Sequence, residues 1–189
     1  SGAQLFLAVG SCSITGIPGH LVENINLNDV HIEFEGGGTP EDYSRIIPEE
    51  EKEYPEAAMF GILSSCGFFV RHASNIKFSE VTIKTASPDA RPALILSDVN
   101  DSEFSEMKLG STKGNECAIN ITNSSNLLIS ESKVSGGANS FLKIDGSLSK
   151  RLVIQNNILE NTKKLFDSGN QKSAVVESGN LIFDGIKNK

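Results

Sequence analysis

The segment Asn75-Ile-Lys-Phe-Ser-Glu-Val-Thr-Ile83 decides the fold, because its apolar pattern recurs along the chain. Counted from Ile76, apolar residues stand at the first, third, sixth and eighth positions. The residues at the third position of the successive copies are separated by 51, 26, 25, 25 and 29 residues. They are Leu27, Phe78, Phe104, Ile129, Ile154 and, in a weaker copy, Phe183. A repeat of this length is typical of solenoid proteins.

A second, shorter segment precedes each strong copy of the repeat. Apolar and polar residues alternate in most of these segments, which is the pattern of a strand with one buried face. No long amphipathic helix lies between the two segments of a copy. The preceding segments are residues 20–22, 68–72, 93–97, 118–122 and 141–145.

Two or three short strands per 25 residues predict an all-β fold, a right-handed parallel β-helix of about six to seven rungs. One rung cannot bury its apolar face alone, whereas stacked rungs roughly 4.8 Å apart pair their backbone groups with those of their neighbours. Like residues should then form columns, one through Leu27 and Phe78 and another through Ile25 and Ile76. The alternative is an antiparallel sandwich, in which such regular spacing is hard to obtain.

Asparagine stands just before the first column at Asn24, Asn75 and Asn126. Asparagine tolerates the left-handed backbone conformation, so we expect a repeated bend at these positions. The first rung begins near the N-terminus, and only residues 5–9 form a possible earlier strand. We therefore expect an exposed N-terminal solenoid edge that is open to pairing with another chain.

Length and composition indicate one domain, residues 1–189, of ordinary globular type, with 38% apolar and 22% charged residues. No apolar run approaches the roughly 18–20 residues that span a membrane, and no signal-peptide pattern is present. The net charge of −7 argues against nucleic acid and membrane partners. Cys12, Cys66 and Cys117 form no CxxC or Cys/His cluster, so we predict buried thiols, no metal site and no cofactor.

The first spacing of 51 residues predicts one rung with an acidic insertion at about residues 35–60. Eight acidic and two basic residues between Glu35 and Glu56 carry −6 of the net charge. Pro48 followed by three glutamates predicts one or two turns of helix. Long insertions on solenoids form loops on one face, often the binding face. We interpret the insertion as a lid or rim beside a groove, and the alternatives are a solvated decoration or an acidic patch that weakly attracts Ca²⁺.

Several motifs, taken in order over about residues 13–109, resemble the C-terminal part of bacterial glycoside hydrolase family 28 proteins, the polygalacturonase-like enzymes with a pectin-lyase-type β-helix. The motifs are Ile14-Thr-Gly-Ile-Pro-Gly-His20, Gly36-Gly-Gly-Thr39, Pro48-Glu-Glu-Glu-Lys-Glu-Tyr54, Gly67-Phe-Phe-Val-Arg-His72 and Asp89-Ala-Arg-Pro92. The resemblance implies a periplasmic or secreted protein that acts on an acidic plant polysaccharide or oligosaccharide. Inverting enzymes of this kind use two carboxyl groups roughly 6.5–9.5 Å apart.

The family's Asn-Thr-Asp, Asp-Asp, Gly-His-Gly and Arg-Ile-Lys motifs are absent from this sequence. In the family they lie upstream of the matched region, so the resemblance implies that this chain begins after the active site. We therefore predict no catalytic residue here and leave open whether the protein is an enzyme. The alternative is a non-catalytic β-helix module for carbohydrate binding or structural assembly.

The candidate substrate-binding residues are Arg71, His72, Arg91 and Asp98. A guanidinium binds a uronate carboxylate in a bidentate pair, and a histidine can bond a sugar hydroxyl. The polar ends of the preceding strands should line a groove, and they are Arg71, His72, Asp98, Asn123 and Asp145. The alternative is that Arg71 and Arg91 pair with acids of residues 41–56 and hold the insertion against the solenoid.

Overall fold

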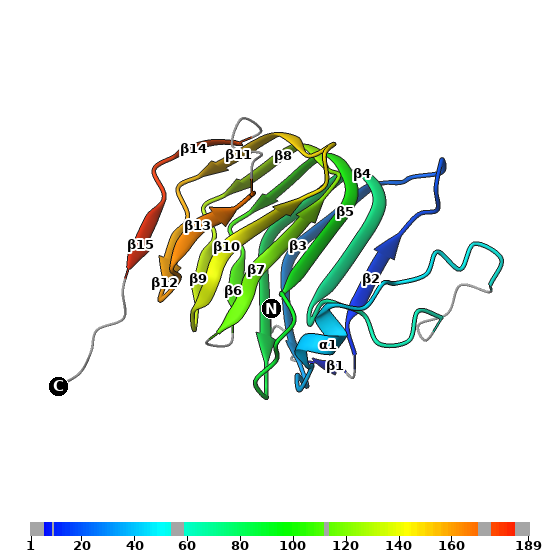
Figure 1. Cartoon of the computed structure of the whole chain (residues 1–189), viewed down its shortest axis with the longest axis horizontal. Coiled ribbons are helices and arrows are strands. Elements are labelled where there is room, and N and C mark those ends of the chain that lie inside the picture. The colour runs from blue at the N-terminus through cyan, green and yellow to red at the C-terminus, as the bar shows by residue number, and fades with distance from the viewer. Residues whose placement is uncertain (1–5, 9, 54–58, 112–113, 170–174, 184–189) are drawn as a thin grey trace.

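The computed structural model describes residues 6–8, 10–53, 59–111, 114–169 and 175–183, which form a β-solenoid whose strands pair in parallel (Figure 1). This architecture is consistent with the predicted right-handed parallel β-helix and excludes the antiparallel sandwich. The described residues contain one short helix, α1 (Pro40–Tyr43). The β-helix fold therefore follows from the repeat alone.

The strands form three parallel stacks along the solenoid axis. The first stack contains β2 (Cys12–Thr15), β4 (Phe68–Thr85), β5 (Leu94–Ser105), β7 (Asn115–Thr122), β10 (Ala138–Asp145) and β13 (Lys164–Asp167). The second contains β3 (Val22–Phe34), β4, β5, β8 (Ser125–Ser130), β11 (Lys150–Gln155) and β14 (Val175–Ser178). The third contains the ends of β3 and β4, then β6 (Lys108–Gly110), β9 (Lys133–Ser135), β12 (Ile158–Glu160) and β15 (Leu181–Phe183).

The two ends of the solenoid differ from its middle. The four central coils, from Phe68 to Glu160, have a stacked neighbour on each side and bury their inward side chains. The inward side chains of the first coil are half-buried, and most of the last coil is exposed. At the N-terminal end, β1 (Phe6–Ala8) pairs with residues 32–34 of β3, within the region predicted as an earlier strand. The described strands thus stack six deep in the first two stacks and, with β1, seven deep in the third, and four coils are fully packed.

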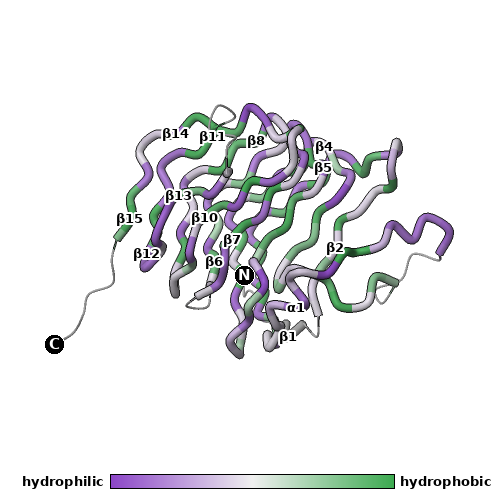
Figure 2. The backbone as a smooth tube through the Cα atoms, in the orientation of Figure 1, coloured by the Kyte–Doolittle hydropathy of each residue, from purple (hydrophilic) through white to green (hydrophobic). Residues whose placement is uncertain are grey.

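The predicted columns are confirmed by the strand register. Apolar and polar segments alternate along the strands in Figure 2, because successive side chains point to opposite faces. Within the core, Phe68, Phe78 and Phe104 stack edge to face, with ring centroids 5.1 and 5.2 Å apart. One column consists of Leu27, Phe78, Phe104, Ile129 and Ile154, and a second of Ile25, Ile76, Ser102, Leu127 and Leu152.

The predicted asparagine bend is also confirmed. Asn24, Asn75 and Asn126 have φ values of 61°, 51° and 55°, in the left-handed region that asparagine tolerates. Their side chains form part of a ladder on the outside of the corner. Asn75 donates to Asn24 at 2.6 Å, Asn126 donates to Asp101 at 2.5 Å, and Arg151 donates to Asn126. The same residue type thus supplies both the bend and the contact between coils.

Two local predictions were wrong. The strand of the first coil that stacks on β4 is Cys12–Thr15, not residues 20–22, because His20 closes a bridge with Ile17 and Val22 begins the next strand. No helix forms at Pro48. Glu50 has φ 51°, and the carbonyls of residues 47 and 48 accept hydrogen bonds from the solenoid rather than from a helical turn.

The helix forms instead at Pro40, where the local chemistry is more favourable. Thr39 is its N-cap and accepts a hydrogen bond from the Asp42 amide, while the Asp42 carboxylate accepts from the Thr39 amide. This reciprocal capping box satisfies two backbone donors that a helix start otherwise leaves unpaired. Pro48 is preceded by Ile47, which has no side-chain acceptor for such a cap.

Candidate functional site

In the connection from β3 to β4, the described residues 35–53 and 59–67 lie over the outer face of the first stack. Helix α1 places Tyr43 over β7, where its hydroxyl accepts a hydrogen bond from Asn120 Nδ2 at 3.0 Å and lies 3.6 Å from Cys117 Sγ. Burial raises the pKa of the Tyr43 phenol, so the hydroxyl stays protonated. The insertion therefore reaches strands far from its own coil and forms a roof over this face of the solenoid.

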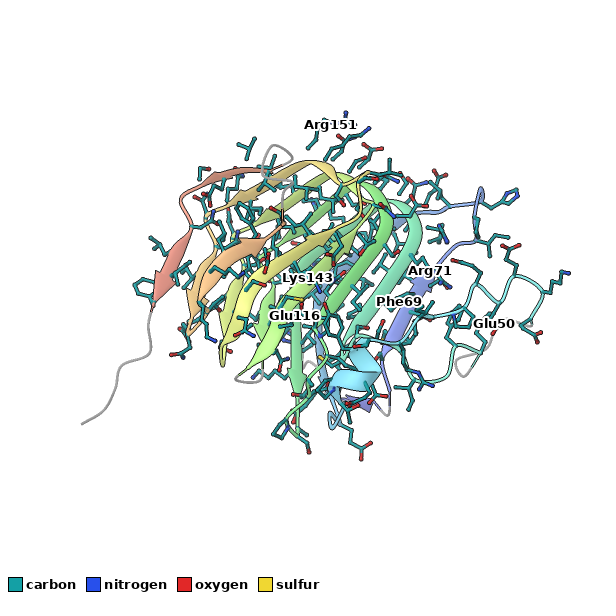
Figure 3. All side chains as sticks on the ribbon, viewed as in Figure 1. Glu50, Phe69, Arg71, Glu116, Lys143 and Arg151 are labelled. Carbon is teal, nitrogen blue, oxygen red and sulfur yellow. The ribbon has the colours of Figure 1, made fainter. Side chains whose placement is uncertain are left out.

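A groove of about 620 Å³ lies between this roof and the first stack. On the roof side it is lined by residues 43–47 and Glu49. The strands contribute Phe69, Arg71, Ile95, Ser97, Glu116, Asn120, Thr122, Lys143 and Asp145, and His72 lies at the end of the β4 segment. In Figure 3, Arg71, Phe69, Glu116 and Lys143 lie along one side of the solenoid, whereas Arg151 lies at a different corner. We call this space the roofed groove.

Arg71 lies at one end of the roofed groove and is 95% buried, with 5% of its side chain exposed. Its guanidinium donates to the carbonyls of Ile47 and Pro48, each at 2.8 Å, and pairs with Glu49 Oε1 at 3.3 Å. It also lies over the rings of Phe60 and Phe69, at 5.4 and 5.3 Å from their centroids. These contacts are those of the alternative in which Arg71 holds the insertion. Its substrate-binding role stays a prediction.

His72 and Asp98 meet beside Arg71, as the sequence analysis expected. His72 Nδ1 lies 2.7 Å from Asp98 Oδ2, and His72 Nε2 lies 3.1 Å from Glu49 Oε2. His72 and Asp98 occupy the same corner of successive coils, with φ values of 49° and 54°. The histidine is therefore held between one carboxylate of the solenoid and one of the insertion.

Arg91 does not line the roofed groove, because it lies beneath the Gly36-Gly-Gly-Thr39 segment. Its Nη2 and Nε donate to Asp89 at 2.7 and 3.0 Å, and its Nη1 donates to the Leu63 carbonyl at 3.1 Å. A Cβ on Gly38 would lie 2.1 Å from Arg91 Nε, so only glycine fits there. The predicted pairing of Arg91 with an acid of residues 41–56 was thus wrong. The Arg91 guanidinium instead forms its ion pair with Asp89, which lies two residues away and is buried with it.

The centre of the roofed groove contains Asp145, which was expected among the polar strand ends, and three polar residues that sequence reasoning did not select, Lys143, Glu116 and Asn120. Lys143 Nζ donates to Glu116 at 2.6 Å, lies 3.9 Å from Asp145 Oδ2 and is 5.8 Å from the Tyr43 ring centroid. Burial opposes the charge of Lys143, but the hydrogen bond to Glu116 and the negative charges of Asp145 and Glu116 together outweigh it and raise the pKa of the ammonium group. Asn120 bridges the roof and the sheet, because its Nδ2 also donates to Asp145 at 3.1 Å.

The sequence signal that could have identified these residues is the alternation of polar and apolar residues along their strands. Asn120, Lys143 and Asp145 stand at the outward positions of strands that the repeat already predicted. The position of Tyr43 had no such signal, because the repeat says nothing about the path of the insertion.

The remaining groups show what chemistry the described residues offer. Cys66 and Cys117 are buried free thiols, and burial raises the pKa of each to about 12, which leaves them protonated and unreactive. Among the described residues, no three His, Cys, Asp or Glu side chains are placed to hold a metal ion. Within the same residues, no helix is long and apolar enough to cross a membrane.

The chain is thus a parallel β-helix protein in which an inserted loop roofs a polar groove on one face. Comparison with family models, curated proteins and solved structures finds no match to this chain.

Proposed function

We propose that the chain binds an oligosaccharide in the roofed groove and that it performs no glycosidic cleavage by itself. The observation that carries the proposal is the lining of this groove. An aromatic ring, an ammonium group, a carboxamide and two carboxylates converge there from separate strands and from the roof. Saccharides are recognised by this combination, because rings cover the apolar faces of sugars while fixed polar groups bond the hydroxyls.

The proposed ligand class is an acidic oligosaccharide of plant origin, and two kinds of support favour it. The motifs quoted above resemble family 28 glycoside hydrolases, whose substrates are acidic plant polysaccharides. The groove lining also offers Arg45, which suits a uronate carboxylate, and Lys143, whose ammonium group would exchange its pair with Glu116 for the ligand carboxylate. The other cation of the groove, Arg71, is already engaged by the carbonyls of the insertion.

The absence of cleavage is supported by the missing family motifs and by the arrangement of the groove acids. Glu116 and Asp145 both flank Lys143, so an ammonium group compensates their charges. In the family named above, the catalytic carboxyl groups lie in motifs that this sequence lacks. The chain would then act as a binding module, or as the saccharide-binding part of a longer glycoside hydrolase.

Isothermal titration calorimetry with oligogalacturonates and with neutral galacto-oligosaccharides tests this proposal. We expect the wild type to bind the acidic ligand, and Lys143→Met to weaken that binding by about tenfold or more, the effect of losing one charge-assisted contact. Lys133→Met is the matched control, because Lys133 pairs with Glu160 in the third stack, outside the groove lining. Absence of binding by the wild type, or equal losses in the two variants, would overturn the proposal.

A further inference from the structure

His72 has a carboxylate on each of its two ring nitrogens, and the two carboxylates belong to different parts of the molecule. Asp98 is fixed in the next coil of the solenoid, where Asn100 Nδ2 also lies 3.4 Å from its other oxygen. Glu49 belongs to the insertion that roofs the groove. The imidazole is 13% exposed, so water replaces either partner only if the insertion moves.

Both carboxylates require an N–H donor, and a neutral histidine can serve only one of them. A neutral imidazole has one N–H and one lone pair, whereas an imidazolium has two N–H donors. Two carboxylates can therefore both accept a hydrogen bond from His72 only when the ring is protonated. When the proton leaves, one carboxylate faces a lone pair and loses its bond.

The geometry decides which contact is lost. The contact with Asp98 is shorter, at 2.7 Å, and both residues stand on stacked coils. The contact with Glu49 is longer, at 3.1 Å, and Glu49 stands on a loop, whereas the exposed fractions of Glu49 and Asp98 are similar, at 40% and 44%. The remaining proton should therefore stay on Nδ1 with Asp98, and the bond to the insertion is the one that breaks.

We propose that His72 is a proton-operated latch: when protonated it holds the Glu49 carboxylate against the roofed groove together with Arg71, and when neutral it leaves Glu49 to Arg71 alone, which loosens residues 49–53 of the insertion. Histidine is the side chain whose charge ordinarily changes between about pH 5 and 8. The latch itself does not depend on the proposed function. Only its consequence does, because loosening the roof would open the saccharide site at neutral and higher pH.

The other charged groups around His72 confine the motion to this segment. Arg71, on the adjacent residue, pairs with Glu49 Oε1 and holds the carbonyls of residues 47 and 48 at every pH in this range. The preceding coil presents Gly16, which brings no charge and packs against the His72 backbone. Glu49, Asp98 and Arg71 are thus the charged groups that face or adjoin the ring, and Arg71 forms the fixed end of the moving segment.

Hydrogen–deuterium exchange of the peptide covering residues 44–53 tests the latch without any saccharide. Each rate is divided by the intrinsic chemical rate at the same pH. Between about pH 5.5 and pH 8 we expect protection in the wild type to fall by about five- to tenfold, as for the loss of one charge-assisted hydrogen bond. The β5 peptide, residues 94–105, should show no such change because it is buried between stacked strands.

Two variants and one control make the result specific. His72→Asn keeps a residue that tolerates φ 49° but cannot titrate, and Glu49→Gln removes the carboxylate, so both should abolish the pH dependence. His20→Asn, which alters an exposed histidine near the first coil, should retain it. Protection independent of pH in the wild type, or an unchanged pH dependence in His72→Asn, would overturn the latch while leaving the binding proposal intact.

Discussion

Glu177 lies directly opposite Ile154 in the parallel pairing of β14 with β11, so a carboxylate occupies the last place in an otherwise apolar core column. Earlier coils fill the same column with Ile129, Phe104 and Phe78. A charged residue that points inward at a sheet edge prevents another strand from pairing there, because pairing would bury the charge. Glu177 therefore opposes stacking of another strand on this part of β14.

Replacing the Glu177 carboxylate by an apolar side chain should cause self-association through the C-terminal coil. Glu177→Leu would continue the apolar column, and the half-buried Leu27 at the N-terminal coil of a second molecule offers the matching surface. We expect concentration-dependent self-association of Glu177→Leu in sedimentation velocity. Ser178→Leu, which stands at the neighbouring outward position, is the control and should sediment as the wild type does. Equal behaviour of the two leucine variants would contradict the role given to Glu177.

Asn157 should be among the most sensitive polar residues of the core. Its Oδ1 accepts the Ser132 amide at 3.0 Å, and its Nδ2 donates to the Ile129 carbonyl at 3.1 Å and to Asn180 Oδ1 at 2.9 Å. Asn157→Ala removes the acceptor of the buried Ser132 amide and a donor to the Ile129 carbonyl, and each buried group left unpaired costs about 1–3 kcal/mol, whereas Asn180 Oδ1 keeps the Asn157 amide as a donor. Urea denaturation should show a loss of this size or more in the free energy of unfolding.

A matched asparagine outside the core gives the contrast. Asn139 accepts one exposed hydrogen bond from Lys163 at 2.6 Å, so Asn139→Ala should change the free energy of unfolding by no more than about 0.5 kcal/mol. Similar losses in the two variants would mean that the buried bonds of Asn157 contribute little.

These residues also show how far the sequence could be interpreted. The sixth position of the repeat holds Val81 and Met107 in two coils but Ser132 and Asn157 in the next two. In the sequence, Ser132 and Asn157 interrupt the apolar pattern. In the structure, their side chains accept hydrogen bonds from backbone amides of the adjacent coils. Columns and bends could be predicted because they depend on spacing and on local conformational preference. A hydrogen bond that replaces an apolar contact leaves the spacing unchanged and gives no periodic signal.

The site was predictable only where it follows the repeat. The meeting of His72 and Asp98 follows from their equivalent places in successive coils. The contact between Tyr43 and Asn120 joins residues 77 positions apart through a loop that has no period. The helix was expected at Pro48 rather than at Pro40, because the three glutamates after Pro48 are a more conspicuous helix-start signal than the capping box around Thr39.

Arg71 should stabilise the insertion more than any single acid of the loop does. Arg71→Ala removes the donors that serve the carbonyls of Ile47 and Pro48, and it leaves Glu49 without its guanidinium partner. Each buried carbonyl left without its donor costs about 1–3 kcal/mol, whereas the pair with the 40% exposed Glu49 adds about 1 kcal/mol at most. We expect a clear drop in melting temperature and rapid cleavage within residues 47–53 by a glutamate-specific protease.

Arg71→Lys distinguishes charge from geometry at the same position. Lysine keeps the charge but cannot present a planar fork to two carbonyls, so we expect an intermediate melting temperature. A wild-type melting temperature in Arg71→Ala, together with lost saccharide binding, would instead make Arg71 a ligand-binding residue.

The pair of Asp89 and Arg91 predicts how acid affects the fold. Burial opposes ionisation of Asp89, but hydrogen bonds from the Arg91 side chain, the Arg91 amide and the Gly38 amide outweigh it, so the pKa of Asp89 lies below its ordinary value. A carboxyl group with a depressed pKa adds stability at pH values above its unfolded pKa, about 4, and this stability is lost as the pH falls through the folded pKa.

Asp89→Asn isolates that contribution. The amide cannot ionise, and the buried guanidinium loses its counter-charge, so the variant should be less stable than the wild type at pH 7 by about 3–5 kcal/mol. The difference should shrink as the pH falls below about 4, because the wild-type carboxyl is then protonated as well. Urea denaturation at several pH values measures it. A difference that stays constant down to the lowest pH at which both proteins fold would show that the charge of Asp89 is not what stabilises the pair.

The proposed absence of cleavage can be tested directly on the same protein. An inverting glycosidase needs a general acid and a general base on either side of the scissile bond, separated widely enough to admit water. Glu116 and Asp145 instead flank one ammonium group, at 2.6 and 3.9 Å from Lys143 Nζ. We therefore expect no release of reducing ends from polygalacturonate or rhamnogalacturonan by this chain. Turnover that Glu116→Gln or Asp145→Asn abolishes, with the fold intact by circular dichroism, would show that these two carboxylates are catalytic and that the roofed groove is an active site.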